Sequence, residues 1–446
     1  MAIQWFELKR AIALRLYDLG IILYGASIRL LAWWQPKAAQ WVAGRKAQQY
    51  PLIIHDNPTH TPRFWVHCAS LGEFEQGRPL IEALRRRYPQ CRVWLTFYSP
   101  SGYTVRHRYE LADWVGYLPL DTAANARHLI DALQPTAVFW VKYEFWQHYL
   151  ETLHARGIPA YLISAQFTAT QIFFQAYGGF FRQMLRYYSH IFVQNPESAQ
   201  LLRQIGIDRL SVSGDTRFDR VASIADQAAD LPLIALFRNE QPLLIAGSTW
   251  QPDEAILLRY IAQRPAELSK FIIVPHEIGE AHIAALCQQL NLALDDAQTP
   301  KSEIATLARV LRYSEILLED TAWQTAVLPK AQILVIDRIG LLATLYRYAN
   351  YAYIGGGFGR GIHNILEAAV WGIPVFFGSR YSQFREAVDL VELQAAFSLR
   401  DADTLRALVK QYPPDSAAYH QIAQIARQYV RQHVGATSRI MAHLNL

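Results

Sequence analysis

The feature that most constrains this sequence is a regular alternation of short apolar runs with longer amphipathic stretches, beginning near Arg63. Such alternation is typical of βαβ units, in which each strand of a parallel sheet is followed by a helix that covers one face. Most of the short runs are rich in Val, Ile, Phe, Tyr or Trp, the residues that favour strands. The sequence therefore predicts an α/β fold built on parallel sheets.

The predicted strands form two groups along the chain. The first group lies at Phe64–His67, Arg92–Phe97, Ala137–Val141, Ala160–Ser164, Ile191–Gln194 and Ser211–Gly214, with helical patterns at Pro79–Arg87 and Ala123–Leu133. The second group lies at Leu243–Gly247, Phe271–Val274, Ile333–Ile336, Tyr351–Ile354 and Val375–Phe377. Because 446 residues exceed the roughly 250 to 300 that one core supports, two doubly wound, Rossmann-like domains are predicted.

Four segments are expected along the chain. Residues 1–48 form an N-terminal helical segment, 49–225 a first domain, 236–412 a second domain, and 413–446 a helix that returns toward the first domain. The join between the domains is placed between Gly214 and Leu243, because charges and small residues fill Asp219–Gln227 and Pro232 and Pro242 interrupt the pattern.

The N-terminal segment mixes apolar and aromatic residues with cations such as Arg10, Arg15 and Arg29. This mixture predicts a helix that lies in or dips into a bilayer interface. The longest mainly apolar stretch, Leu19–Leu31, is shorter than the about 20 residues needed to span a membrane. The alternative is a helix docked on the protein core.

Composition excludes several classes of protein. The 43 Lys and Arg residues exceed the 38 Asp and Glu residues only mildly and without dense basic clusters, which argues against a nucleic-acid binder. Three cysteines without close spacing give neither a disulfide framework nor a zinc knuckle. In Pro275–His282 a Glu occupies the position at which a zinc-protease helix needs its second His, so no metal site and a metal-independent reaction are expected.

Ligands of open parallel sheets bind beyond the carboxyl ends of the strands, so residues that follow strands carry most of the functional signal. Glu73 follows the first predicted strand at the start of a helix, where its carboxylate could accept a proton from an attacking hydroxyl. The helix N-terminus would keep Glu73 ionised. The alternative is a Glu that only caps the helix.

Two further polar clusters lie in the first half. Lys142 and Glu144 follow the strand that ends at Val141, where they form either a functional pair or a structural ion pair. The run Arg106–Arg108 either grips lipid phosphates or forms a solvated helix face.

In the second half, the glycine-rich run Gly355–Gly361 follows a predicted strand and precedes a predicted helix start at His363–Ala369. Glycines let backbone amides approach a phosphate, and a helix N-terminus adds partial positive charge. Glu367, one helical turn beyond Asn364, could accept both ribose hydroxyls of a nucleotide. The alternative is a tight turn followed by a solvated Glu.

These motifs occur in an order that matches a known family over nearly the whole chain. The matching segments are His67–Glu73, Pro79–Leu84, Thr96–Gly102, Pro119–Asp121, Glu144 with Trp146, Gly214–Asp219, Ala246–Thr249, Gly340–Leu342 with Leu345–Tyr346, and Gly361–Glu367. On these segments the sequence resembles the 3-deoxy-D-manno-octulosonic acid (Kdo) transferases of lipopolysaccharide assembly.

The resemblance implies a GT-B fold, in which two Rossmann-like domains face each other across a cleft. It implies an inverting transfer of Kdo from CMP-Kdo, with no cofactor beyond this donor, to lipid IVA, a phosphorylated glucosamine lipid. The N-terminal domain would bind the acceptor at the cytoplasmic face of the inner membrane, and the C-terminal domain would bind CMP-Kdo.

The resemblance also assigns residues. The base is the carboxylate of the S-x-G-E motif, here Ser70, Gly72 and Glu73, and Ser70, Gly72, Lys142 and Glu144 are expected on the acceptor side. The nucleotide contacts correspond to Ser248, Pro275, His276, Gly340, Gly361, Asn364 and Glu367.

The chain departs from the family pattern at three positions. His276 stands where many members have Arg, Leu341 where many have Glu, and Ala368 where a Pro is usual. A His contacts phosphate more weakly than Arg, and in a pH-dependent way. The alternatives are another GT-B enzyme that uses a UDP-sugar, as a transferase or a 2-epimerase, and a membrane-bound scaffold that has lost catalysis.

Overall fold

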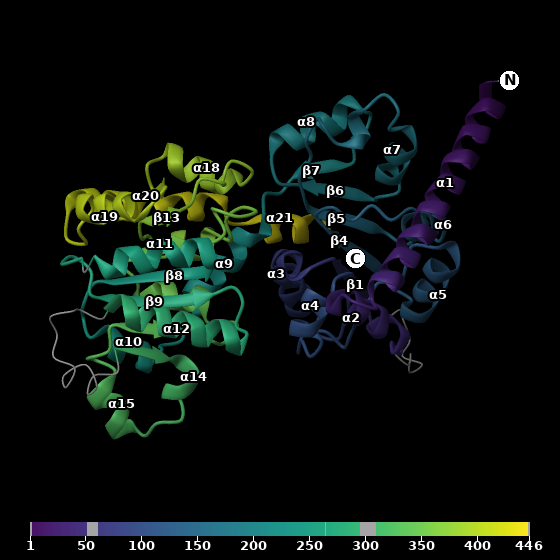
Figure 1. The fold of residues 1–446 in the computed structure, drawn as a ribbon. Helices are drawn as coiled ribbons and strands as arrows, with labels where there is room; N and C mark the ends of the chain where they lie inside the picture. The colour runs from purple at the N-terminus through teal and green to yellow at the C-terminus, as the bar shows by residue number, and fades with distance from the viewer. Residues whose placement is uncertain (1, 51–60, 264, 295–308, 445–446) are drawn as a thin grey trace. The chain divides into compact units, whose positions relative to one another are not determined.

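The computed structural model describes residues 2–50, 61–263, 265–294 and 309–444. The chain divides into two compact units, the first formed by Met1–Arg220 with His433–Leu446 and the second by Val221–Gln432 (Figure 1). Each unit contains a parallel seven-stranded sheet with its own buried core. The α/β class and the two Rossmann-like, doubly wound sheets predicted from the sequence are confirmed.

The sheet of unit 1 has the strand order β3-β2-β1-β4-β5-β6-β7. Its strands are β1 (Arg63–Cys68), β2 (Arg92–Phe97), β3 (Trp114–Tyr117), β4 (Ala137–Val141), β5 (Ala160–Ala165), β6 (His190–Val193) and β7 (Leu210–Val212). Its helices are α1 (Ala2–Leu31), α2 (Pro36–Lys46), α3 (Leu71–Arg87), α4 (Pro100–Arg106), α5 (Ala123–Leu133), α6 (Gln147–Ala155), η1 (Ile172–Phe174), α7 (Gly179–Arg186), α8 (Pro196–Gln204) and α21 (Ala436–His443), and α9 (Thr216–Gln227) leads into unit 2.

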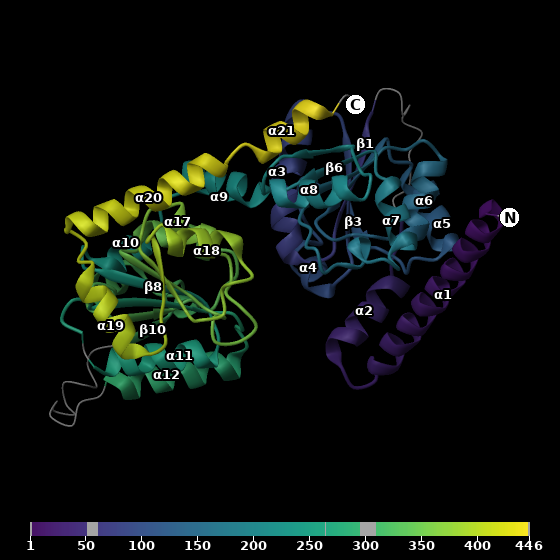
Figure 2. The same cartoon turned by 90° about the horizontal axis from the view of Figure 1, so that it is seen from above.

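The sheet of unit 2 has the order β10-β11-β9-β8-β12-β13-β14. Its strands are β8 (Leu243–Thr249), β9 (Lys270–Pro275), β10 (Val310–Arg312), β11 (Ile333–Val335), β12 (Tyr351–Ile354), β13 (Val375–Phe377) and β14 (Ala396–Ser398). Its helices are α10 (Pro232–Arg238), α11 (Gln251–Ala262), α12 (Glu280–Leu294), α14 (Tyr313–Ile316), α15 (Thr321–Val327), α16 (Leu342–Leu345), η2 (Tyr346–Tyr348), α17 (Leu366–Ala369), α18 (Arg385–Glu392), α19 (Ala402–Gln411) and α20 (Ala417–His433). Figure 2 shows α11 and α12 on one face of this sheet and α10 and α20 on the other.

Helix α5 illustrates how local sequence produces these elements. The Thr122 side chain caps the helix by accepting a hydrogen bond from the Asn125 amide. Residues Ala126, Leu129, Ile130 and Leu133, spaced three or four apart, are buried against the sheet. Strand β4 next to it is buried on both faces, as a strand between two helical layers must be.

Three strands were missed in the prediction from sequence: β3, β10 and β14. They have only three or four residues each, and unlike the equally short β11 (ILV) and β13 (VFF) they include Gly, Arg, Ala or Ser, which favour strands less. All three lie at sheet edges, where pairing with one neighbour is sufficient.

The strand order of each sheet reverses next to its first strand, between β1 and β4 in unit 1 and between β8 and β12 in unit 2. At such a switch point the chain leaves the two strands in opposite directions, which opens a crevice beyond their carboxyl ends. The segments that follow β1 and β4 start at Ala69 and Lys142, and those that follow β8 and β12 start at Trp250 and Gly355. Both predicted site regions therefore lie at switch points.

Helix α1 is docked on unit 1 through polar contacts with α6 and with the segment before α5. Arg10 donates to Glu151 at 2.9 Å, the Tyr17 hydroxyl donates to Asp121 at 2.5 Å, and Asp18 lies 2.6 Å from His148. These contacts anchor one side of α1 to the rest of unit 1.

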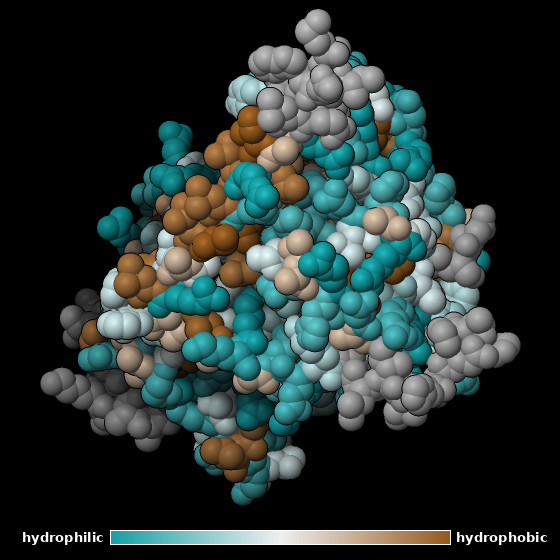
Figure 3. All heavy atoms as spheres, turned by 90° about the vertical axis from the view of Figure 1, so that its right-hand side faces the viewer, coloured by the Kyte–Doolittle hydropathy of each residue, from teal (hydrophilic) through white to brown (hydrophobic). Residues whose placement is uncertain are grey.

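The other side of α1 carries exposed apolar residues. Figure 3 shows them as a brown band, formed by Ile12, Leu16, Leu19, Leu23 and Leu30, which we call the apolar stripe. The prediction that the apolar stretch is too short to span a membrane was wrong. Arg10–Leu31 forms one apolar helix of 22 residues, which is long enough to cross a membrane by length and composition. The helix extends the apolar segment on its N-terminal side, from Leu19 back to Arg10.

Helix α21 is held in unit 1 by the carboxylate of Asp219, which accepts hydrogen bonds from the Gly435 amide at 2.5 Å and from the Thr437 amide and hydroxyl at 2.6 Å. We expect Asp219→Ala to lower the free energy of unfolding by about 2 to 4 kcal/mol, because three part-buried donors lose a charged acceptor. Chemical denaturation measures this loss. The exposed Asp226 on the same helix, α9, provides the control: Asp226→Ala should change stability by less than about 0.5 kcal/mol.

Candidate active site

Glu73 lies in the first turn of α3, directly beyond the carboxyl end of β1. Its backbone amide donates to Ser70 Oγ at 3.4 Å, and its Oε2 accepts a hydrogen bond from the Ala69 amide at 2.5 Å. The carboxyl group therefore caps the helix, as the simpler alternative proposed, and at the same time has a fixed position at the switch point. A capping role does not exclude proton transfer by the same carboxyl group.

The expectation that the helix N-terminus keeps Glu73 ionised was wrong. Burial, followed by the negative charge of Glu144, raises the pKa of Glu73 to about 7. The Ala69 amide and the positive charge of Lys142 lower this pKa, but by less. A carboxyl group that titrates near neutral pH is suited to accept a proton and release it again.

Glu144 is buried beyond the end of β4 and is held by aromatic and imidazole groups. Its Oε2 lies 2.9 Å from His67 Nε2 and accepts a hydrogen bond from Trp146 Nε1 at 2.5 Å, and the Tyr188 hydroxyl donates to its carbonyl oxygen. The alternatives for Lys142 and Glu144 were a functional pair and a structural ion pair. The structure holds Glu144 in a fixed hydrogen-bond network, and Lys142 has a left-handed backbone conformation, with φ of 70°. Such a conformation is costly for a non-glycine residue and is found mainly at functional sites.

The run Arg106–Arg108 is in part structural. Arg106 donates to Glu75 at 3.1 Å and its guanidinium lies over the Phe74 ring, so this side chain is already engaged. His107 Nδ1 lies 3.1 Å from the Thr104 carbonyl oxygen. Among the three residues, Arg108 is the exposed cation for which the structure shows no partner within the described ranges.

In unit 2, three aromatic rings stack beyond the ends of β8, β9 and β12. The ring centroids of Trp250 and His276 lie 4.4 Å apart, those of His276 and His363 lie 4.6 Å apart, and Trp250 Nε1 donates to His363 Nε2 at 3.0 Å. Burial, with a smaller effect of His276, lowers the pKa of His363 to about 4, so His363 is neutral at neutral pH. His276 was predicted from the sequence, whereas Trp250 and His363 were not, because they become neighbours only through the sheet.

The glycine-rich run is a tightly packed turn, as the alternative proposed. Four of its amides already donate within the protein: Gly355 to Gly247, Gly356 to Asp253, and both Gly359 and Gly361 to the Gly356 carbonyl oxygen. The predicted phosphate cradle of Gly355–Gly361 is therefore mostly occupied by internal hydrogen bonds.

The predicted helix start at Asn364–Glu367 is shorter than expected, because α17 has only four residues and so a weak dipole. Asn364 Nδ2 donates to Glu367 Oε1 at 3.0 Å, which fixes both side chains beside the stacked rings. Ser248 lies at the end of β8 with φ of 53°, Pro275 ends β9, and Gly340 is exposed with φ of 99°. The structure brings Pro275, His276, Asn364 and Glu367 to the carboxyl edge of this sheet.

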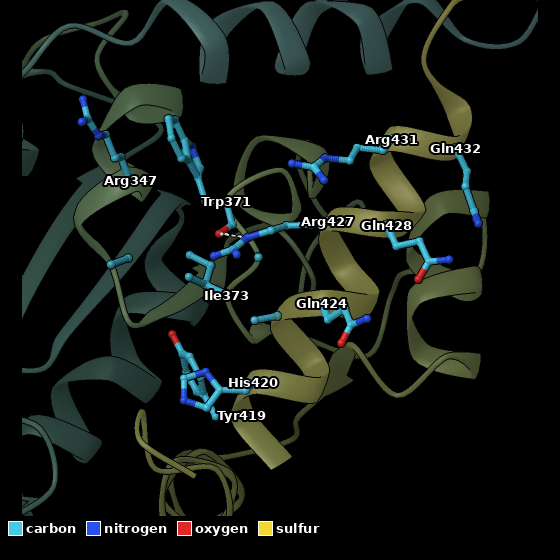
Figure 4. A pocket seen from close by; sticks show the side chains of 13 residues that line it. Arg347, Trp371, Ile373, Tyr419, His420, Gln424, Arg427, Gln428, Arg431 and Gln432 are labelled. Carbon is cyan, nitrogen blue, oxygen red and sulfur yellow. Dashed lines mark hydrogen bonds between the residues drawn. The ribbon is translucent and has the colours of Figure 1, made fainter. Parts of the chain in front are cut away.

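A separate groove of about 790 Å³ lies at the opposite edge of unit 2, before the amino ends of β12 and β13 (Figure 4). It is lined by α20 and by the segments around Arg347 and Trp371, and Arg427 donates to the Trp371 carbonyl oxygen at 3.1 Å. Since the predicted nucleotide contacts lie at the carboxyl edge, this groove is not the predicted donor site.

Comparison with known proteins finds relatives of the sequence. Residues 32–220 match the family model of 3-deoxy-D-manno-octulosonic-acid transferase (kdotransferase). Proteins of that name from Bordetella pertussis and Haemophilus influenzae are 27% and 23% identical to the chain, over 84% and 89% of its length and 85% and 90% of theirs. The chain is similar to the Kdo transferases over most of its length. The matched residues include Ser70, Glu73, Lys142 and Glu144 of unit 1.

Solved structures show the same architecture. The UDP-GlcNAc 2-epimerase from Neisseria meningitidis bound to UDP-GlcNAc superposes with a TM-score of 0.56 over 86% of this chain and 98% of its own, at 13% identity. The S. aureus MnaA–UDP structure gives 0.55 over 86% and 95%, at 12% identity. At this identity the likeness concerns the fold alone, and it confirms the GT-B type predicted from the sequence.

Proposed function

We propose that this protein transfers Kdo from CMP-Kdo to lipid IVA, or a closely related phosphorylated glucosamine lipid, at the cytoplasmic face of the inner membrane. Similarity to the Kdo transferases supports the reaction class. The observation that carries the proposal is Glu73, a carboxyl group with a pKa of about 7 that is fixed at the switch point of unit 1. Sugar transfer to an alcohol requires a base of this kind.

In the proposed reaction, the ionised carboxylate of Glu73 takes the proton of an acceptor hydroxyl. The hydroxyl oxygen attacks the anomeric carbon of Kdo, and the bond between that carbon and the CMP phosphate oxygen breaks with inversion. The electron pair of the broken bond leaves with CMP. Each step uses groups of the acceptor, the donor and Glu73, and we propose that no metal ion takes part.

Unit 2 would hold CMP-Kdo at the carboxyl edge of its sheet. Of the backbone amides near α17, those of Asn364 and Ile365 make no hydrogen bond within the described residues, which leaves them free to donate to a phosphate. The stacked rings of Trp250, His276 and His363 offer an aromatic surface beside them. We assign Ser248, Gly340, Gly361 and Glu367 to the same site as part of the proposal.

The apolar stripe of α1 would place unit 1 on the lipid surface. We expect the double variant Leu16→Gln, Leu19→Gln to lower the membrane-bound fraction at least tenfold, because burial of each Leu in the bilayer contributes about 1.5 to 3 kcal/mol. Sedimentation with vesicles of anionic lipid measures this fraction. The matched control is Leu318→Gln in unit 2, which replaces another exposed Leu and should bind vesicles as the unchanged protein does.

The direct test of the function is incubation of the protein with CMP-Kdo and a tetra-acylated, phosphorylated glucosamine disaccharide, with EDTA present. We expect mass spectrometry to show a lipid heavier by Kdo, together with released CMP. A parallel series with UDP-sugars tests the alternative: turnover of a UDP-sugar without turnover of CMP-Kdo would contradict the proposal. Absence of turnover with every donor would favour a scaffold that has lost catalysis.

A further inference from the structure

We propose that the groove beside α20 is a binding site for a soluble, phosphate-bearing small molecule, separate from the predicted donor site. The groove measures about 790 Å³, a volume within the range of small-molecule sites. It lies before the amino ends of β12 and β13, at the edge of the sheet opposite the predicted donor contacts. The inference concerns unit 2 alone and does not rest on the proposed function.

The groove has an apolar floor and a polar rim. Small and aliphatic side chains form the floor, where Ala349, Ile373 and Ala423 are each at most 8% exposed. None of the 13 lining residues is Asp or Glu, so the groove holds cationic groups without a carboxylate among them. The rim consists of exposed polar residues of α20, namely His420, Gln424, Arg427, Gln428, Arg431 and Gln432.

Two arginines of α20 supply the positive charge of the rim. Arg427 and Arg431 are one helical turn apart, and Figure 4 shows both side chains directed from α20 toward Trp371. Like charges at this spacing destabilise a helix, and an anion bound between them would remove the repulsion. Neither guanidinium forms an ion pair with any residue that the structure describes. The pair is therefore suited to receive an external anion.

The position of Arg427 is fixed by the backbone of the segment opposite α20. Its Nε donates to the Trp371 carbonyl oxygen at 3.1 Å. Its side chain packs against Gly372, where an added Cβ would lie 2.3 Å from Arg427 Nε and 2.7 Å from Arg427 Cγ. Because only the Nε hydrogen is used in this contact, the terminal N–H groups of the guanidinium stay free for a ligand. A guanidinium held in this way loses little conformational freedom when it binds.

The groove offers more hydrogen-bond donors than acceptors. Arginine side chains only donate, and the amide groups of Gln424 and Gln428 add further N–H donors beside them. A phosphate group presents negative charge and acceptor oxygens, which planar guanidinium groups bind through paired hydrogen bonds. The apolar floor can accommodate an organic group attached to the phosphate. These features together indicate a small phosphorylated ligand.

Two other basic side chains line the groove and contribute less. Arg347 pairs with Asp230 at 2.8 Å and donates to the Ala228 carbonyl oxygen at 3.2 Å, and Figure 4 shows it directed away from α20. His420 lies beside Tyr419 at the start of α20, with 6.0 Å between the ring centroids. The binding energy should therefore depend mainly on Arg427 and Arg431.

The test is calorimetric titration of the full chain with inorganic pyrophosphate, with CMP present to occupy the predicted donor site. We expect pyrophosphate to bind, with an affinity that falls as salt is added. Arg431→Gln should weaken this binding at least about tenfold, because charge-assisted hydrogen bonds to phosphate are lost. The double variant Arg427→Gln, Arg431→Gln should weaken it at least about a hundredfold.

A second variant changes the charge of the rim without removing a contact. Gln428→Glu is nearly isosteric and exposed, and it places a carboxylate three residues before Arg431. It should weaken pyrophosphate binding at least about tenfold through repulsion and competition for the arginines. Thermal melting should show that both Arg431→Gln and Gln428→Glu remain folded, because neither replaced side chain makes a hydrogen bond with the described residues.

The matched control is the double variant Arg259→Gln, Lys410→Gln. It removes two exposed positive charges from α11 and α19, outside the groove. Screening by salt confines the effect of such charges to their surroundings, so pyrophosphate binding should stay within about twofold of that of the unchanged protein. An equal loss in this control and in the double variant of α20 would show a general charge effect and contradict a site in the groove.

Three other outcomes would overturn the inference. The first is pyrophosphate binding that is absent, or that is equal in the unchanged protein and in Arg431→Gln. The second is a lower melting temperature of Arg431→Gln with unchanged binding, which would mean that Arg431 only stabilises the carboxyl end of α20. The third is sedimentation with phosphatidylglycerol vesicles that depends on Arg427 and Arg431 without pyrophosphate binding, which would identify a lipid headgroup in place of a soluble ligand.

Discussion

Replacement of Glu73 by Gln is expected to reduce Kdo transfer by about 10²- to 10⁴-fold, the range that a general base contributes. Gln is nearly isosteric, and its oxygen can still accept from the Ala69 amide that now binds Glu73 Oε2. The helix cap therefore survives while the base is removed. Single-turnover measurement of lipid product, with CMP binding measured separately, distinguishes this loss from a loss of donor affinity.

Glu82→Gln provides the matched control for this experiment. Glu82 lies on the same helix, α3, and pairs with Arg78 at 2.8 Å, away from the switch point. Its replacement should leave the transfer rate within about twofold, since an i,i+4 pair contributes only about 0.3 to 0.5 kcal/mol to stability. Activity of Glu73→Gln close to that of Glu82→Gln would show that another group is the base.

The Glu73→Gln substitution should also stabilise the protein at alkaline pH. The pKa of Glu73 is about 7 in the folded chain and about 4.3 in an unfolded one, so the unfolded state releases its proton first as pH rises. The stability of the unchanged protein should therefore fall between about pH 4.3 and pH 7. Glu73→Gln has no proton to release and should be more stable above pH 7 by up to about 2 to 3 kcal/mol, measured by urea denaturation.

Gly355→Ala should disrupt the donor side of the protein. A Cβ on Gly355 would lie 2.1 Å from the Ser248 carbonyl oxygen and 2.7 Å from Thr249 Cα, both of them backbone atoms that cannot turn aside. We expect a stability loss of about 1 to 3 kcal/mol and at least a tenfold loss of CMP affinity, because the ends of β8 and β12 must separate. Calorimetric titration with CMP measures the affinity.

Gly359→Ala in the same turn is the matched control. Its Cβ would meet only the Gly356 carbonyl oxygen at 3.6 Å, an ordinary contact, and Gly359 does not have a positive φ. CMP affinity should change by less than about twofold. Equal losses in the two variants would indicate that this turn is sensitive to any side chain, and would contradict the role of the Gly355–Ser248 contact.

Several residues of the site could be found from sequence because their signal is local. Glu73 and Glu144 lie in the segments that follow apolar strand runs, His276 comes directly after such a run, and Asn364 follows another across the glycine-rich turn. Position after a strand predicts the carboxyl edge of a parallel sheet without any knowledge of strand order. Family resemblance then gave these positions their roles.

Other features could not be found because they depend on residues distant in sequence. His67 and Glu144 meet only because β1 and β4 pair in the sheet. The stack of Trp250, His276 and His363 joins the ends of three strands in the same way. The occupied amides of the glycine run became visible only with Asp253 and Gly247 beside them.

The sequence by itself determined the class of fold, the number of sheets and the strand ends at which chemistry is placed, because hydrophobic period and strand propensity are local properties of a chain. Only the tertiary structure decided the switch points, the docking of α1 and the ionisation of Glu73. The raised pKa of Glu73 follows from its burial and from the charge of Glu144. The folded sheet produces the burial and brings Glu144 near Glu73. Electrostatic energy depends on distance and solvent exposure, which the order of residues does not contain.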